Sequence, residues 1–238
     1  MDSIELVARY SFITNKLRYC GPEESYLKFL EYIKNPNEKL ANEIKSYIKR
    51  FEGLYPYLQL IAKKHGLDEF DYKVMEAYWL GNELLDKFTE TDLKEIIFTL
   101  TKRGLPKSYA EKLTKNIPSG MLPHHSFNVI YVGVGKVTGS VKFNLENINN
   151  CLIRPGKVVK SKEKTAIIQH RPYRYDKGKL ELGNPIEEEF DNQFNSLKKG
   201  DTVSIHWKFI VDKLTEEQYS NLLKYNFKNI QALNNSIL

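Results

Sequence analysis

The sequence predicts an α+β protein in which a helical N-terminal half packs on a small twisted β-sheet or partial barrel with flanking helices. In the first half, apolar residues recur every three or four positions, the spacing of an amphipathic helix. The second half contains β-branched and aromatic runs separated by turn residues. Because the change falls at Ile117–Gly120, we expect a helical region over 1–118 and a β-rich α+β region over 119–238, joined in one continuous structural unit.

The first half carries a series of helix start and stop signals. Pro22, followed by two glutamates, opens one helix, and Asn35-Pro36 opens the next. Gly53 and Pro56 interrupt the second pattern before it continues to a stop at Gly66.

Three more helices are expected before the boundary. Asp68 and Asp71 cap the first of them. Thr91–Arg103 forms the second and ends at Gly104, and a short helix follows Pro106.

Strands dominate the prediction for the second half. The segments with strand character are Phe127–Val134, which reads as buried, Lys157–Val159, Thr165–Gln169, the hairpin Arg174–Leu182 and Asp201–Val211. Val141–Cys151 predicts a helix, and the capping-box pattern Thr215–Gln218 opens the final one.

The cysteine content and the hydropathy of the chain indicate the cellular compartment that we expect. The chain has only two cysteines, too few for a disulfide framework, and no run approaches the about 20 apolar residues that span a bilayer. Its acidic N-terminus lacks the pattern of a signal peptide. We expect a cytoplasmic protein with no membrane partner.

Cys20 is the first candidate for chemistry. A thiol directly before a helix start lies in the positive end of the helix dipole, which lowers its pKa. His124 and His125 precede the predicted strand at Phe127, where a general base for this thiol is expected. Asn15 is the candidate amide donor for an oxyanion.

The Cys20-Gly21-Pro22 motif and the following histidines locally resemble papain-like cysteine peptidases, whose nucleophile opens a helix and whose histidine heads a strand. The chain departs from that family at Thr14, where the peptidases place an oxyanion glutamine, and Asn144 is the nearest candidate for their third residue. The resemblance implies thiol-dependent acyl chemistry.

A metal site is an alternative interpretation of nearly the same residues. Two cysteines and three histidines offer soft or borderline ligands, namely Cys20, Cys151, His124, His125 and His206. No spacing motif supports a ligand set, so a metal is the less favoured expectation and no organic cofactor is implied.

Two further groups suggest ligand binding. Glu76, Trp79 and Asn82 are spaced three apart and are expected on one helical face that lines a pocket, with His206 as another lining residue. In 154–179, nine Lys and Arg face only two acidic residues. Within it, Arg171, Arg174, Lys177 and Lys179 suggest a nucleic-acid surface.

Over most of its length the chain resembles an uncharacterised prokaryotic protein family, a domain of unknown function. The matching residues are Ala8-Arg9-Tyr10, Asn15, Tyr19-Cys20-Gly21-Pro22, Glu52-Gly53, Tyr55-Pro56-Tyr57-Leu58, Glu76-Ala77-Tyr78-Trp79, Gly81-Asn82, His124-His125-Ser126-Phe127 and Ser204-Ile205-His206-Trp207. The resemblance implies no assigned activity. It places members beside hydrogenase and other metalloenzyme genes, which implies a metalloenzyme accessory role as a rival to catalysis.

Our leading hypothesis is thiol-dependent acyl or amide transfer, or hydrolysis, on a small molecule or peptide. Cys20 attacks, His125 or His124 accepts the proton, and Asn15 holds the oxyanion. The first alternative is a non-catalytic accessory or maturation factor for a metalloenzyme that binds a peptide, metal or small ligand in the same cleft. The second is an RNA-binding module.

Overall fold

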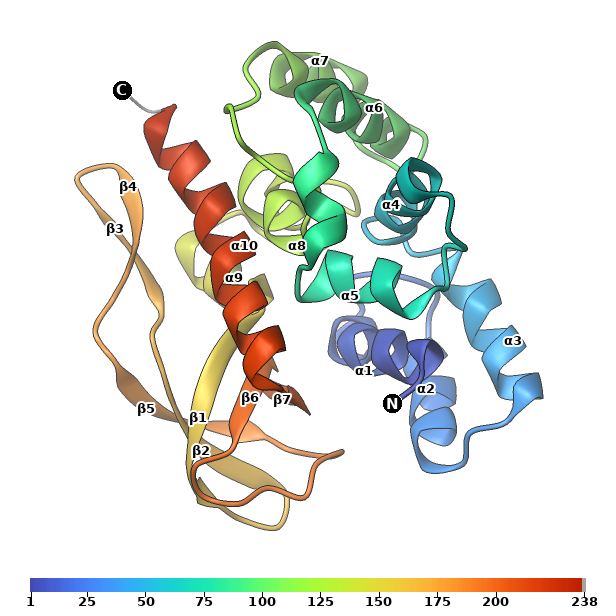
Figure 1. Cartoon of the computed structure of the whole chain (residues 1–238), viewed down its shortest axis with the longest axis vertical. Helices are drawn as coiled ribbons and strands as arrows, with labels where there is room; N and C mark the ends of the chain where they lie inside the picture. Colours follow the sequence, from blue (N-terminus) through green and yellow to red (C-terminus); the bar gives the residue numbers. More distant parts are fainter. Residues whose placement is uncertain (237–238) are drawn as a thin grey trace.

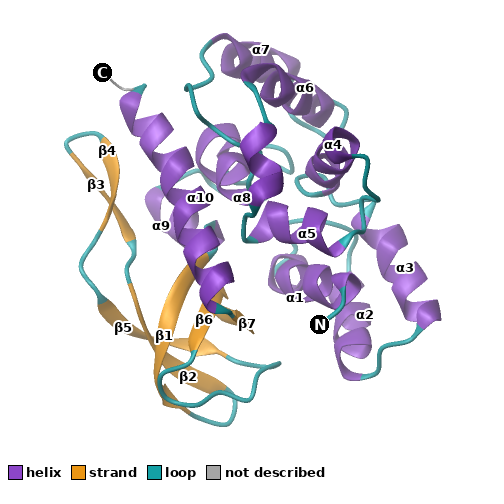
Figure 2. Cartoon of the chain, in the orientation of Figure 1, coloured by secondary structure: helices purple, strands orange, loops and turns teal. Residues whose placement is uncertain are grey.

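The computed structural model describes residues 1–236 and confirms the α+β class (Figure 1). Helices fill the first half of the chain and strands are confined to the second, as the colouring by element type shows (Figure 2). The first half contains α1 (Ser3–Lys16), α2 (Ser25–Lys34), α3 (Glu38–Ile48), α4 (Tyr55–His65), α5 (Tyr72–Trp79), the 3₁₀ helix η1 (Glu83–Lys87), α6 (Glu90–Thr101) and α7 (Lys107–Lys115).

Side-chain caps begin several of these helices. Asp71 accepts a hydrogen bond from the first turn of α5, as predicted, and Asp2 does the same for α1, a helix absent from the prediction. Thr89 and Asp92 form a capping box at α6. Gly66 ends α4 with a φ of 66°. Among residues 1–236, no helix combines the length and the apolar character of a membrane-spanning segment.

The segment after the predicted boundary is still helical. It contains α8 (His125–Phe127), the π-helix η2 (Asn128–Gly133) and α9 (Leu145–Cys151). The prediction of a buried strand at Phe127–Val134 is therefore wrong. A short apolar run buried on most sides has the same composition in either state, and periodicity cannot separate the two.

The strands β1, β2, β5, β6 and β7 close into a barrel in the order β1-β2-β5-β7-β6. They are β1 (Arg154–Ser161), β2 (Thr165–His170), β5 (Ile186–Asp191), β6 (Thr202–His206) and β7 (Phe209–Lys213). Neighbours are antiparallel except β5 and β7, which meet in parallel at Asp191 and Phe209. This five-stranded barrel, with a meander closed by one parallel pair, has the strand arrangement of an OB fold.

A two-stranded hairpin and the C-terminal helix flank the barrel. The hairpin β3 (Tyr173–Asp176) and β4 (Lys179–Leu182) has its turn at the predicted place, and α10 (Glu216–Asn235) starts at the predicted capping box. In Figure 1 the hairpin rises beside the upper part of α10. Leu180 and Asn234 pair here through two hydrogen bonds of 2.9 Å, which hold β4 to the helix.

Two details of the barrel differ from the prediction. Asp201–Val211, expected as one strand, forms the hairpin β6–β7, because Trp207 and Lys208 both adopt positive φ and reverse the chain. The strand β5 was not predicted, since its Ile-Glu-Glu-Glu-Phe-Asp sequence is mostly exposed and acidic.

The larger buried cluster contains residues from both halves of the chain. Phe12 of α1, for example, packs against Phe209 of β7 with ring centroids 5.3 Å apart. A second, smaller cluster fills the barrel interior and consists of Val158, Ala166, Ile168, Phe190, Val203, Ile205 and Ile210. The site described next lies within the larger cluster.

Candidate functional site

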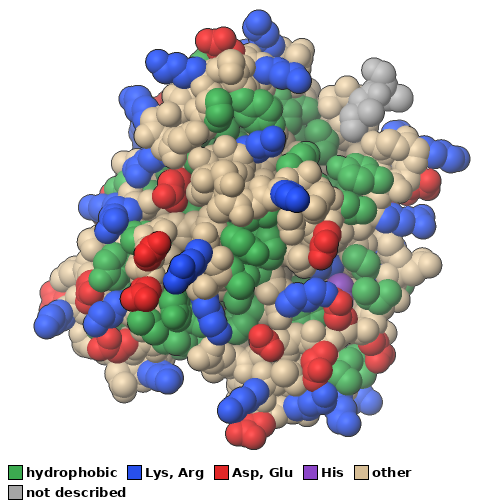
Figure 3. Space-filling model, turned by 180° about the vertical axis from the view of Figure 1, so that it is seen from behind, with side chains coloured by type: hydrophobic (Ala, Val, Ile, Leu, Met, Phe, Trp, Pro, Cys, Tyr) green, Lys and Arg blue, Asp and Glu red, His purple; other side chains and the backbone are tan. Residues whose placement is uncertain are grey.

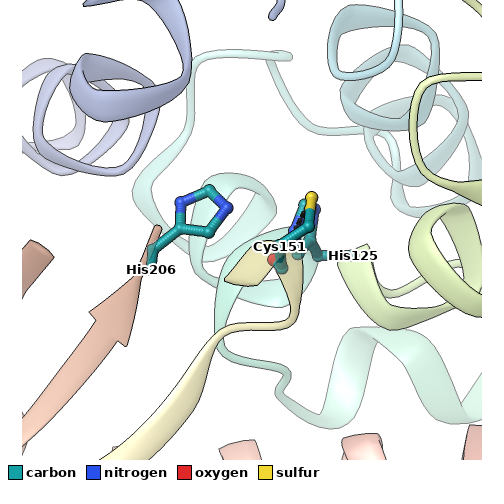
Figure 4. Close-up of side chains that lie close together, drawn as sticks. All are labelled: His125, Cys151 and His206. Carbon is teal, nitrogen blue, oxygen red and sulfur yellow. Dashed lines mark hydrogen bonds between the residues drawn. The ribbon is translucent and has the colours of Figure 1, made fainter. Parts of the chain in front are cut away.

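Three side chains from separate elements converge in the core. His125 begins α8, Cys151 ends α9 and His206 ends β6. Their potential metal-binding atoms all lie within 4.8 Å of one another (Figure 4). Their exposed fractions are 5%, 8% and 1%, so two imidazoles and a thiol are held together away from solvent.

The hydrogen bonds of His125 are in conflict when its ring is neutral. Nδ1 lies 3.2 Å from the hydroxyl of Tyr78, which in turn donates to the carbonyl of Gly53, and Nε2 lies 2.9 Å from the carbonyl of Cys151. Both nitrogens would have to donate, but a neutral imidazole donates from only one. Burial lowers the pKa of His125 to about 4, so the ring is neutral at pH 7.

The sulfur of Cys151 is the third potential donor of the cluster and lies near Nε2 of His125. Sγ lies 4.0 Å from Nε2 of His125. Burial raises the pKa of the Cys151 thiol to about 12, and the nearby Trp207 indole offsets only part of that effect. The thiol is thus protonated at neutral pH unless a cation lies beside it, since a coordinated metal removes the proton outright.

His206 is the least satisfied member. Neither ring nitrogen has a hydrogen-bond partner of acceptable geometry within residues 1–236. Burial, with His125 as a second cause, holds the pKa of His206 well below its usual value, although the carbonyls of Tyr10 and Cys151 oppose this. Because an unpartnered buried polar group costs about 1–3 kcal/mol, this imidazole requires an explanation.

Aromatic rings and a small cavity surround the cluster. The Trp79 ring lies 4.9 Å from that of His125 and 6.2 Å from that of His206, centroid to centroid. A cavity of about 70 Å³ adjoins them, and its walls include Cys20, Tyr78, Trp79, His125, Cys151 and Trp207. That volume has room for a few water molecules or an ion.

Cys20, the predicted nucleophile, lines this same cavity but is held by a carboxylate. Its thiol donates to Oε2 of Glu52 at 3.7 Å, and the backbone N–H of Gly21 donates to the same oxygen at 3.1 Å. Burial raises the pKa of the Cys20 thiol to about 12, and Glu52 adds to the shift. The expected lowering by a helix dipole is absent because α2 begins only at Ser25.

The amide of Asn15 is engaged by backbone. Nδ2 donates to the carbonyls of Cys20, at 3.0 Å, and Pro22, at 2.6 Å, and Oδ1 accepts from the N–H of Tyr26 at 2.7 Å. These three bonds fix the turn between α1 and α2. Both amide hydrogens have backbone acceptors, so the oxyanion role stays a prediction with no free donor to support it.

His124 lies apart from His125. It caps α8, where Nδ1 accepts from the N–H of Ser126 at 3.2 Å and lies 2.8 Å from its hydroxyl. Burial lowers the pKa of His124 to about 3. Asn229 of α10 holds the same segment through Leu122 and Ser126. The structure thus brings His125, and not His124, to the cavity.

Glu76, Trp79 and Asn82, which were expected on one helical face lining a pocket, have different surroundings in the structure. Trp79 packs against the His125 ring. Glu76 instead accepts from Asn82, at 3.2 Å, and from Gln218 of α10, at 3.0 Å. Asn82 follows the end of α5 and caps η1. These two polar side chains therefore connect helices.

The candidate nucleic-acid residues lie on or before the hairpin β3–β4. Arg174 and Lys177 are exposed, and Arg171 donates to the carbonyl of Gly183, while Lys179 is half-buried. The acidic strand β5 runs beside β2 and supplies Glu188 and Glu189 to lysines of the barrel. On the face shown in Figure 3, basic and acidic side chains intermingle and form no continuous basic surface.

Two residues that contact the site were missed from the sequence. Tyr78 and Glu52 touch His125 and Cys20, respectively, from distances of 47 and 32 residues along the chain. Nothing in local spacing could have paired them.

Comparison with known proteins gives a family without an assigned activity. No curated protein and no solved structure matches the chain. A family model described as "Family of unknown function (DUF6390)" matches residues 2–238, which confirms the predicted resemblance to an uncharacterised family, and the chain belongs to this family.

Proposed function

We propose that this protein binds one transition-metal ion through His125, Cys151 and His206 and acts as a metal-binding accessory protein. The observation that carries the proposal is the convergence of three buried donor atoms within 4.8 Å. Two imidazoles and a thiolate are the donor set that holds zinc with a fourth exogenous ligand, or copper in a trigonal site.

A cation would give all three side chains a partner, with Nε2 of His125 exchanging its hydrogen bond to the carbonyl of Cys151 for the metal. With a metal at Nε2, His125 keeps its proton on Nδ1 and donates to Tyr78, whose hydroxyl donates on to Gly53. A metal-bound histidine typically donates its other ring N–H to an oxygen atom in this way. His206 would gain a partner. Zinc–nitrogen and zinc–sulfur bonds of about 2.0–2.3 Å require the donors to move together by about 1 Å.

The cavity beside the cluster leaves room for an exogenous ligand on the bound ion. Three protein ligands leave one coordination position, and the cavity adjoins both His125 and Cys151. A space of about 70 Å³ admits water or a small anion as the fourth ligand.

Metal analysis of protein purified without a histidine tag tests the proposal. We expect close to one equivalent of zinc or copper per chain, and less than a tenth of an equivalent in Cys151→Ser and His206→Gln. Cys20→Ser removes the other thiol and should keep the metal. Cobalt substitution should give a thiolate-to-metal charge-transfer band that Cys151→Ser lacks. A metal content that is unaffected by Cys151→Ser would refute the site.

Thiol chemistry at Cys20 is the second candidate, because Cys20 and His125 line one cavity. It requires the thiol to ionise despite its raised pKa. Iodoacetamide should then alkylate Cys20 near pH 7 at least about tenfold faster than a free thiol, with Cys20→Ser as the control. A thiol that reacts only after denaturation would eliminate this candidate.

A further inference from the structure

A second, larger cavity lies on the barrel, away from the His125–Cys151–His206 cluster. It has a volume of about 420 Å³ and is bounded by β1, the end of β2, the hairpin β3–β4 and α10. Its polar lining comprises Arg154, Lys157, Gln169, His170, Arg171 and Thr202. No carboxylate is among the residues that line it.

Arg154 is the key residue of this cavity. The residue is 6% exposed, and within residues 1–236 its guanidinium has no acidic group in ion-pair distance. Nε donates to the carbonyl of Asn149 at 3.2 Å, and Nη1 donates to Nδ1 of His170 at 2.7 Å. Burial lowers the pKa of Arg154 to about 10, which leaves it charged at pH 7. A buried cation without a counter-ion is costly.

The carboxylate beside His170, Glu188, already pairs with another cation. Nε2 of His170 donates to Glu188 at 3.3 Å, and Glu188 also accepts from Lys208, which forms an ion pair with it. His170 receives the Arg154 N–H on its other nitrogen and stays neutral, since burial and Arg154 lower its pKa to about 4. Glu188 therefore acts on Arg154 only across the His170 ring and is shared with Lys208, so Arg154 has no direct carboxylate partner.

Two more cations and an apolar rim surround Arg154. Lys157 on β1 and Arg171 after β2 line the same cavity and are exposed. The Nε of Arg171 donates to the carbonyl of Gly183 at 2.8 Å, which orients its guanidinium. The cavity lining also includes the exposed side chains of Tyr219, Leu223 and Leu182. Three cations beside flat and aliphatic surface suit a doubly charged head on an apolar body.

We infer that this cavity binds a small organic phosphate, of the size of a mononucleotide, with the phosphate on Arg154, Lys157 and Arg171 and the organic part against Tyr219 and Leu223. Guanidinium groups recognise phosphate oxygens by paired hydrogen bonds, and the buried one is pre-organised by Asn149 and His170. The site rests on residues other than those of the proposed metal centre and does not depend on it.

Isothermal titration calorimetry of the full chain tests this assignment with adenosine 5′-monophosphate, inorganic phosphate and adenosine as probes. We expect the monophosphate to bind at least about tenfold more tightly than either of the other two. Lys157→Gln and Arg171→Gln should each weaken it by about tenfold or more. Lys160→Gln removes the same charge from an exposed position on β1 outside the cavity and should bind like the wild type.

Arg154→Gln should abolish binding, and a circular dichroism spectrum shows whether that variant folds; the two exposed variants carry the test in either case. Absence of binding by all three probes would overturn the assignment. Equal weakening by Lys160→Gln would overturn it too, because it would indicate general charge attraction. Affinity for single-stranded oligonucleotides that rises with length beyond one nucleotide would also overturn the assignment, since the ligand would then be nucleic acid.

Discussion

The sulfur of Cys151 lies 4.0 Å from Nε2 of His125, although 26 residues and a π-helix separate them along the chain. This contact exists because α8 and α9 present their opposite ends, the first residue of one and the last of the other, to the same point. His206 reaches that point from the barrel.

His206→Leu should separate stability from metal binding. Replacing an unpartnered buried imidazole with an apolar side chain is expected to stabilise the metal-free protein by about 1 kcal/mol. The same variant should lose the gain in unfolding free energy that the proposed metal is expected to give the wild type. Urea unfolding with and without chelator measures both effects.

His124→Leu is the matched control for that variant. Nδ1 of His124 caps α8 through Ser126, so its removal should destabilise the protein by about 1 kcal/mol while the three proposed metal ligands stay in place. If His206→Leu destabilised the metal-free protein as much as His124→Leu, the imidazole of His206 would have a partner.

Asn229→Ala should destabilise the protein by about 3 kcal/mol. The amide pairs with the N–H and C=O of Leu122 and also donates to Ser126, so truncation leaves buried groups unsatisfied. Chemical denaturation measures the loss, and Gln231→Ala, at an exposed position on the same helix, should change stability by less than about 0.5 kcal/mol. Equal effects of the two would contradict this role.

Gly21→Ala should cost about 1–2 kcal/mol more than Gly120→Ala. Both glycines have positive φ, 80° and 86°, so both substitutions carry the same backbone strain. A Cβ on Gly21 would lie 2.3 Å from the Phe51 ring, whereas nothing lies within 4 Å of one on Gly120. Equal losses in thermal unfolding would show that Phe51 moves aside without cost.

Asp212 gives stability a specific dependence on pH. Burial raises the pKa of its carboxyl from 3.8 to about 6, although Arg9 opposes this from 3.6 Å. The native state then binds more protons than the unfolded state between these values. The stabilisation is therefore fully present below pH 3.8 and is lost as pH rises through 6.

Asp212→Asn removes that dependence. From pH 4 to pH 7, the stability of the wild type relative to this variant should fall by up to about 3 kcal/mol. Urea unfolding at several pH values measures the difference. Glu187→Gln deletes an exposed carboxylate of β5 and controls for net charge. A difference independent of pH would be the contrary result.

Local chemistry explains what the sequence predicted well. Backbone groups at the starts of α5 and α10 and in the β3–β4 turn are satisfied by residues only a few positions away. Their patterns can therefore be recognised from the sequence alone. By contrast, Phe127–Val134 is buried on most sides, and its helix–strand choice depends on what surrounds it. The strand β5 is held by pairing with β2 and has no apolar pattern of its own.

The sequence offers His125, His206 and Cys151 only as part of a larger set of possible metal ligands that also includes Cys20 and His124. The favoured prediction instead centres the chemistry on Cys20. That emphasis rested on a helix dipole, and three residues of turn between Gly21 and Ser25 remove it. Which thiol meets which imidazole is decided by the packing of α8, α9 and β6, and this is tertiary information.

The tight turn at Trp207 and Lys208 has a consequence for assembly. The N–H of Trp207 donates to the carbonyl of Asn150 at 2.7 Å, so the reversal that joins β6 to β7 is tied directly to the residue preceding Cys151. His206 can reach the other two donors only after this hairpin has closed against α9. An ion bound there would stabilise the closed barrel, because a chain whose barrel had not formed could not bring the three donors together to retain it.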